Sequence, residues 1–232
     1  MSVHTQGVIQ ALIRANKPKP AEEEARERKP VVTISRDLGT GGDAISEALA
    51  ARLNVECYNM EVLDAVAKST NVNASLLQSL HEKVNKASDA WLYSVVFGKS
   101  VSRDDYLSNL VTTVRGIYRK GGIIIGRGGH VILAGRDVLR VRLTGSVEVC
   151  GRRYALAQDI GLTEARKTVR ERNRARGQFI WKMFKSRVND PQNFDLVVNM
   201  DHFADYDQAV EIIMIAAHAL GLTKEIVVAA EV

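Results

Sequence analysis

The sequence predicts an α/β protein built on a doubly wound, parallel five-stranded sheet flanked by helices. Three observations support this fold class. Short strands of β-branched residues alternate with segments of helical period between residues 31 and 220. The run Ile123–Ile125 is wholly apolar, which is typical of a parallel strand that is buried on both faces. A glycine-rich loop joins the first strand to the first helix, where doubly wound sheets bind their ligands.

The elements follow one another in the order that such a sheet requires. Apolar residues at i, i+4 and i+8 (Ile45, Leu49 and Leu53) predict a helix directly after the glycine-rich loop. Residues 60–119 have a helical period that is interrupted near 71–73, 86–88 and 98–100. The predicted strands cover residues 31–35, 55–59, 123–125, 138–143 and 194–199, and later helices begin near residue 146 and span 163–187 and 206–220.

Residues 1–30 are expected to be an appendage to this domain, which spans residues 31–220. Val8, Ile9, Leu12 and Ile13 form an apolar stripe at helical spacing, and a proline-containing, charged linker follows them. The segment is either a loosely docked tail or a helix that binds a protein partner or a second copy of the chain. Residues 221–232 form a C-terminal tail.

The composition excludes several classes of protein. Of the 232 residues, 46% are hydrophobic and 25% are charged, which are the values of a globular chain rather than a disordered one. No apolar run approaches the length of a membrane-spanning helix, and the N-terminus does not have the pattern of a secretion signal. Cys57 and Cys150 are too few for a disulfide framework or a zinc site, so we expect a cytoplasmic protein.

The positive charge is confined to one part of the chain. The formal net charge is +5, yet residues 140–190 contain 13 basic and 5 acidic residues, so the rest of the chain is net acidic. This distribution predicts one element that binds anions. Binding to nucleic acid is the least favoured interpretation.

The glycine loop, which we define as Gly39-Thr40-Gly41-Gly42, predicts a phosphate site. Between a strand and a helix, such a loop directs several backbone N–H groups at an anion, and the helix N-terminus adds partial positive charge. The pattern departs from the standard G-x-x-x-x-G-K-[ST], because Arg36 takes the place of the first glycine and Gly42 that of the lysine, and the hydroxyl that holds magnesium is missing. An ordinary tight turn is the alternative interpretation.

Arginines form the second group of candidates. Arg127 follows the apolar strand between two glycines, which places it at the carboxyl edge of the sheet, where it could clamp a phosphate or pair with a carboxylate. His130 is expected to be structural. In the Arg-rich helix, Arg172 and Arg176 share one face. The other face carries Arg166, Arg170 and Arg174, so the helix can direct only one set at a ligand.

Five segments together resemble the cytidylate-kinase-like family, a branch of the P-loop nucleoside monophosphate kinases. They are V-V-T-I-S-R-D-L-G-T-G-G-D-A-I, I-I-I-G-R-G-G-H, L-T-G-S-V-E-V, R-E-R-N-R-A-R-G-Q-F and N-D-P-Q-N-F-D-L-V-V-N. The resemblance covers about residues 31–220. It implies a core sheet, a helical acceptor region at 59–119, an Arg-bearing lid at 163–190, and transfer of the γ-phosphoryl group of ATP to a monophosphate such as CMP.

The resemblance also implies roles for individual residues. Arg36 and the glycine loop (Gly39, Thr40, Gly41 and Gly42) would hold ATP, Arg127 would contact the acceptor phosphate, and Arg172 and Arg176 would close over the phosphates. Asp37 is the nearest acidic candidate for binding Mg²⁺ or for ordering a water molecule. The chain departs from the family pattern at Asp43, where an arginine is usual, and at Asn59, Asn173 and Phe179, where Asp, Asp and Tyr are usual. A nucleotide-binding sensor or assembly subunit without catalysis is therefore the alternative function.

Overall fold

The computed structural model describes residues 29–68 and 103–223, which form two compact units. One unit contains residues 29–58 and 121–223, and the other contains residues 59–68 and 103–120. Nearly all of the predicted N-terminal appendage, the predicted helix breaks between 71 and 100, and the end of the C-terminal tail lie outside the described residues. Among the described helices, none is long and apolar enough to cross a membrane.

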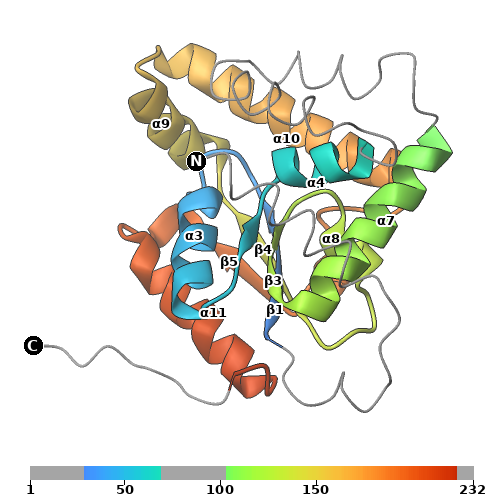
Figure 1. Ribbon diagram of the computed structural model, residues 1–232. Helices are drawn as coiled ribbons and strands as arrows, with labels where there is room; N and C mark the ends of the chain where they lie inside the picture. Colours follow the sequence, from blue (N-terminus) through green and yellow to red (C-terminus); the bar gives the residue numbers. More distant parts are fainter. Residues whose placement is uncertain (1–28, 69–102, 224–232) are drawn as a thin grey trace, which may run out of the picture. The chain divides into compact units, whose positions relative to one another are not determined.

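The larger unit is built on a five-stranded, all-parallel sheet with the strand order β2-β3-β1-β4-β5 (Figure 1). The strands are β1 (Val31–Arg36), β2 (Cys57–Tyr58), β3 (Gly122–Ile125), β4 (Leu139–Thr144) and β5 (Leu196–Asn199). The predicted fold class is confirmed. The chain passes from β3 on one side of β1 to β4 on the other, so the strand order reverses beside β1, where doubly wound sheets bind ligands.

The hydrophobic core lies on one face of this sheet, beneath two helices that lie side by side, α3 (Gly42–Arg52) and α11 (Tyr206–Ala219) (Figure 1). Alternate residues of β1 and β3, including Ile34 and Ile125, point into this core. Ile45 and Leu49 of α3 are fully buried there, as their helical spacing predicts. The core therefore fixes where β1 ends and α3 begins, which is where the glycine loop lies.

The Arg-rich segment forms one long helix that pairs with the helix before it. Ser146 caps α9 (Val147–Gln158) by accepting a hydrogen bond on its Oγ from the Val149 N–H. After a turn in which Asp159 has a left-handed backbone, α10 (Leu162–Phe184) packs along α9. The remaining elements of this unit are the short helices α8 (Gly129–Ile132), η2 (Pro191–Asn193) and η3 (Met200–His202).

The smaller unit consists of two helices, α4 (Met60–Lys68) and α7 (Arg103–Lys120), which pack against each other. The Tyr106 hydroxyl of α7 donates a 2.7 Å hydrogen bond to Oδ1 of Asp64 in α4. Asn59, one of the departures from the family pattern, accepts on Oδ1 from the Val62 N–H and so serves as the cap of α4.

Candidate functional site

The glycine loop borders a cleft at the carboxyl end of β1, with a volume of about 190 Å³. The cleft is lined by the loop itself and by side chains from the start of α3, from α9, from α10 and from the start of α11. These residues are Arg36, Asp37, Leu38, Gly39, Gly41, Gly42, Asp43, Ala44, Arg153, Tyr154, Ala157, Arg176 and Tyr206.

The backbone of the glycine loop requires its glycines. Gly39 has φ +86°, and a Cβ built there would lie 2.4 Å from the Cys150 carbonyl oxygen. Gly41 has φ +75°, and a Cβ there would lie 2.3 Å from the Tyr206 ring. Gly41 also stands at the N-cap of α3 without a side-chain cap, so the first N–H groups of this helix are open to a ligand. The loop thus has the shape and polarity that phosphate needs.

Two arginine side chains bring unsatisfied donors to the cleft. The Arg36 side chain is only 10% exposed and donates from Nη2 to Oδ1 of Asp43 at 2.9 Å. Arg153 donates from Nη2 to the carbonyl oxygens of Met200 and Phe203. Arg36 Nε and Arg153 Nη1 are both buried and have no hydrogen-bond partner among the described residues. Buried N–H groups without partners are costly, and both arginines line the cleft, where an anion would engage their guanidinium groups.

Arg176 is the third arginine of the cleft and comes from the middle of α10. Its Nη1 donates to the Arg36 carbonyl oxygen at 3.2 Å. Burial, and secondarily the positive charge of Arg36, lower the pKa of Arg176 to about 10, so the guanidinium is still charged at neutral pH. Three guanidinium groups on the walls of one small cleft favour the binding of a polyanion.

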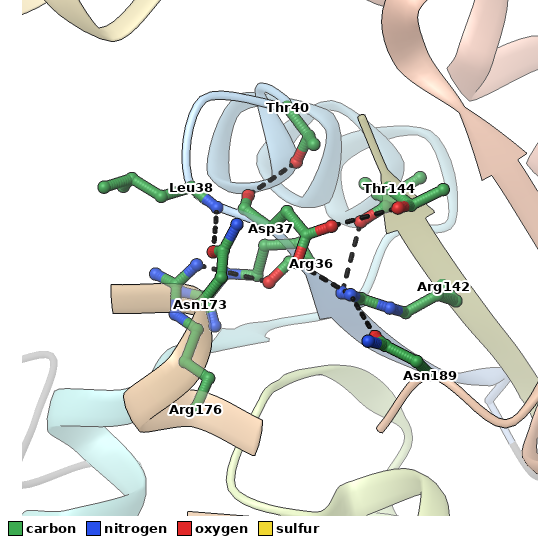
Figure 2. A network of polar contacts seen from close by, with 10 residues as sticks. Arg36, Asp37, Leu38, Thr40, Arg142, Thr144, Asn173, Arg176 and Asn189 are labelled. Atoms are coloured by element: carbon green, nitrogen blue, oxygen red, sulfur yellow. Dashed lines mark hydrogen bonds and ion pairs between the residues drawn. The ribbon is translucent and has the colours of Figure 1, made fainter. Parts of the chain in front are cut away.

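Asp37 lies at the centre of a polar network behind the loop (Figure 2). Its Oδ1 accepts from Arg142 Nη2 at 2.7 Å, and its Oδ2 accepts from the Thr144 hydroxyl at 3.0 Å. Arg142 Nη2 also donates to Asn189, just beyond the end of α10. Both oxygens of the predicted magnesium ligand are therefore engaged with protein donors, and its metal role stays a prediction.

A hydrogen bond also joins α10 to Leu38, the residue just before the glycine loop (Figure 2). The Leu38 N–H donates to Oδ1 of Asn173 at 2.8 Å. Thr40, a predicted ligand residue, is fully buried, and its hydroxyl donates to the Asp37 carbonyl oxygen. Thr40 thus shapes the loop from within, while the loop is held in place by Asn173.

Arg127 lies in a loop of unusual backbone conformation. Gly126, Arg127 and Gly128 all have positive φ angles, of +73°, +48° and +75°. The Arg127 guanidinium lies over the Phe179 ring of α10, 4.7 Å from its centroid. Arg127 and Arg172 are not among the residues that line the cleft, so the structure does not bring these two predicted catalytic residues together with Arg176 there.

His130 and the remaining arginines have structural or solvent-facing positions. His130 is buried and stacks on Phe194 with the ring centroids 4.7 Å apart, and burial lowers its pKa to about 4. Of the arginines on the other face of α10, Arg166 pairs with Glu148, whereas Arg170 and Arg174 are exposed. The two predicted faces of the helix therefore have different surroundings.

The roles of Arg153 and Arg142 were not predicted from the sequence. Arg153 is one of many basic residues between 140 and 190, and no motif distinguishes it from its neighbours. The sequence did contain a pattern that indicates a buried partner for Arg142. Arg140 and Arg142 stand at alternate positions of an otherwise apolar strand, so their side chains share one face of the sheet. On that face Arg142 is only 5% exposed, which obliges it to find a partner such as Asp37.

The carboxylates of the cleft could contribute to a metal site. The described residues contain no group of three or more His, Cys, Asp or Glu that could hold a metal ion. Magnesium in phosphoryl-transfer sites commonly takes only one or two carboxylates, with phosphates and waters as its other ligands. The cleft has two carboxylates, Asp37 and Asp43, and its donor set therefore fits a metal that arrives with a nucleotide.

The chain is similar to one known protein family and to proteins of known structure. The model of the cytidylate kinase-like family matches residues 31–202. No curated protein matches the chain. An uncharacterized protein from Eubacterium ventriosum ATCC 27560 has a similar structure, with a TM-score of 0.63, 18% identity, and coverage of 82% of this chain and 99% of that one. This likeness shows the fold alone.

A shikimate kinase from Bacteroides thetaiotaomicron is a weaker structural match. It has a TM-score of 0.46 and 14% identity, with 82% of this chain and 98% of that one covered. We draw no conclusion from this second match.

Proposed function

The chain belongs to the cytidylate kinase-like family, and from this premise we propose that it transfers the γ-phosphoryl group of ATP to a nucleoside monophosphate, CMP or a close analogue. The single observation that carries the proposal is the pair of buried, unpartnered donors, Arg36 Nε and Arg153 Nη1, beside the glycine loop. A polyphosphate site needs backbone N–H donors and positive charge. Here the glycine loop and the open N-terminus of α3 supply the N–H donors, and three guanidinium groups supply the charge.

The proposed reaction needs no general base, because the acceptor phosphate is already anionic. One of its oxygens forms a bond to the γ-phosphorus, the bond from that phosphorus to the β–γ bridging oxygen breaks, and ADP leaves. The protein has to bring two anions together and stabilise charge on the transferred group. We assign this task to the N–H groups of the glycine loop and to Arg36, Arg153 and Arg176. A preorganised donor of this kind contributes about 3 kcal/mol to transition-state stabilisation.

Other parts of the proposal rest on the family pattern. Mg²⁺ bound with the nucleotide would neutralise part of the charge on the phosphates. Arg127 is proposed to fix the acceptor phosphate, and Arg172 to join Arg176 in covering the phosphates. The choice of CMP as acceptor comes from the family alone.

A coupled assay of ADP release with CMP, UMP, AMP and GMP tests the proposal. We expect acceptor-dependent turnover with at least one monophosphate. Arg176→Ala should lower kcat about 100-fold, because one preorganised contact to the phosphates is lost. Arg174→Ala is the matched control, because Arg174 is exposed on the same helix. Absence of acceptor-dependent turnover in the unmodified protein would contradict the proposed activity.

A nucleotide-binding subunit without catalysis is the second candidate. It is favoured by the loop itself, in which Gly42 replaces the lysine that reaches the terminal phosphates, and Asp43 takes up one donor of Arg36. Calorimetry with ATP separates the candidates, since this alternative predicts binding without turnover. A protein partner at the N-terminal segment stays a proposal. The absence of nucleic-acid binding is also a proposal, and it predicts that the protein has no DNA or RNA affinity that falls as the salt concentration rises.

A further inference from the structure

We propose that Asp43 makes this cleft selective for a polyphosphate that carries a divalent cation, over the free polyphosphate anion, by contributing a ligand to that cation. The inference rests on the proposed function, because it concerns the form in which the same cleft takes its nucleotide. Asp43, and not Asp37, would then be the carboxylate that contacts the metal.

The two carboxylates of the cleft differ in their availability. Asp37 has a side chain that is 12% exposed, and protein donors engage both of its oxygens. The Asp43 side chain is 71% exposed, and its Oδ1 accepts from Arg36 at the mouth of the cleft. A cation that enters with a nucleotide can reach Asp43 without breaking a buried ion pair. Reaching Asp37 would disturb the network that holds the loop.

The position of Asp43 in the chain supports the same assignment. Asp43 is the second residue of α3 and the eighth residue when Arg36 is counted as the first. In the standard pattern the eighth residue is the serine or threonine whose hydroxyl holds magnesium beside the phosphates. Here a carboxylate stands at that place. Carboxylate oxygens are among the ligands that Mg²⁺ prefers.

The contact with Arg36 gives Asp43 two opposite effects. Arg36 is nine-tenths buried and has a second donor, Nε, without a partner among the described residues, so its guanidinium is placed for an anion. In the absence of a cation, Asp43 competes with phosphate for Arg36 and repels it. When a divalent cation lies between Asp43 and the phosphates, the same negative charge becomes attractive.

Calorimetry with ATP in the presence and absence of Mg²⁺ tests this inference on the full-length protein. We expect Mg²⁺ to strengthen ATP binding to the unmodified protein about 100-fold. In Asp43→Asn, metal-free ATP should bind about tenfold more tightly than to the unmodified protein, because one close like charge is removed, and the gain from Mg²⁺ should fall to about threefold. Glu47→Gln removes the same charge one turn further along α3 and should behave as the unmodified protein does.

The outcomes separate this inference from the proposed function. If Asp43→Asn binds ATP with the same dependence on Mg²⁺ as the unmodified protein, Asp43 only stabilises the first turn of α3, and the inference is wrong although the proposed function stands. If the unmodified protein binds ATP under neither condition, both are wrong. Loss of Mg²⁺ dependence in both variants would show a general effect of charge and would also overturn the inference.

Discussion

The backbone N–H of Leu38 donates to Oδ1 of Asn173, a residue 135 positions further along the chain, at a distance of 2.8 Å. This bond joins the segment before the glycine loop to the middle of α10. Arg176, one turn further along the same helix, donates to the Arg36 carbonyl oxygen. The Arg-rich helix is therefore held against this segment through backbone groups of Arg36 and Leu38, while the Arg36 side chain lines the cleft.

Removal of the Asn173 acceptor should destabilise the protein. In Asn173→Ala the partly buried Leu38 N–H loses its partner, and we expect the free energy of unfolding to fall by about 1–2 kcal/mol. Asn173→Asp keeps the acceptor, so its free energy of unfolding should fall by less. Urea denaturation measures the difference, with Gln178→Ala at an exposed position of the same helix as the control. Equal losses in the Ala and Asp variants would show that this bond does not stabilise the loop.

The ion pair between Asp37 and Arg142 should couple strongly. Both side chains are nearly buried, at 12% and 6% exposure, so either single replacement leaves an uncompensated charge. We expect Asp37→Asn and Arg142→Met each to cost about 3 kcal/mol, and the double variant to be about 2 kcal/mol more stable than the sum of the single effects predicts.

A double-mutant cycle by urea denaturation measures this coupling. The more exposed pair of Arg140 and Asp195, at 22% and 26% exposure, provides the comparison and should show a smaller coupling energy. Coupling energies of the same size in the two pairs would contradict the importance of burial here.

Two glycines allow the effect of backbone strain to be separated from that of a collision. Gly39 and Gly135 have positive φ angles, of +86° and +74°, but a Cβ would meet Cys150 only at Gly39 and has open space at Gly135. Gly135→Ala should cost about 1 kcal/mol from backbone strain alone. Gly39→Ala should cost about 2 kcal/mol more and should weaken ATP binding, because the loop has to move. Similar losses of stability in the two variants would show that the loop accommodates the methyl group.

His130 should make stability depend on pH. Its pKa is lowered to about 4 by burial and, to a lesser extent, by the nearby charges of Arg142 and Arg140, whereas an ordinary histidine titrates near 6.5. The unfolded chain therefore binds a proton more readily than the folded one. The stability from neutral His130 is complete above about pH 6.5 and is lost as the pH falls to about 4, with a total of about 3 kcal/mol.

The difference in pH dependence between the unmodified protein and His130→Phe checks this prediction, because other groups that titrate in the same range cancel. Phenylalanine can keep the stacking on Phe194 but cannot take up a proton. The free energy of unfolding of the variant should fall less steeply between pH 6.5 and 4. Parallel curves would show that His130 has an ordinary pKa.

The fold was accessible from the sequence because strand and helix periods are local. The apolar run Ile123–Ile125 and the i, i+4 spacing of Ile45 and Leu49 each specify a buried element without knowledge of its neighbours. All five predicted strands are present in the described sheet, with ends that differ from the prediction by at most two residues. The glycine loop was predicted for the same reason, since its residues are consecutive.

The partners of the loop could not be predicted in the same way. Arg153, Asn173 and Arg142 reach the loop or its supporting network from three different elements, and their pairing depends on how those elements pack. Helical geometry separated Arg176 from Arg174 but could not show which carbonyl Arg176 would meet. Nor could it show that Arg127 would rest on an aromatic ring instead of the cleft wall.

Phe179 should act as a positioning residue for Arg127 in the proposed reaction. The Arg127 guanidinium lies 4.7 Å from the centroid of its ring, a geometry in which the cation is attracted to the ring face and holds one orientation. Phe179→Leu keeps an apolar side chain but removes the ring, so the Arg127 guanidinium loses the aromatic face over which it lies. If Arg127 binds the acceptor phosphate, the KM for the monophosphate should rise about tenfold, while the KM for ATP changes little.

Phe179→Tyr retains the ring and is the matched control, expected to keep the KM of the unmodified protein. A residue that merely fills the core would lower the stability in Phe179→Leu without a change in the KM for the acceptor. Because Phe179 is only 8% exposed, the unfolding of each variant has to be followed alongside its kinetics. An equal rise in both KM values would place Phe179 in the general packing of α10 and would remove the argument that Arg127 is held ready for the acceptor.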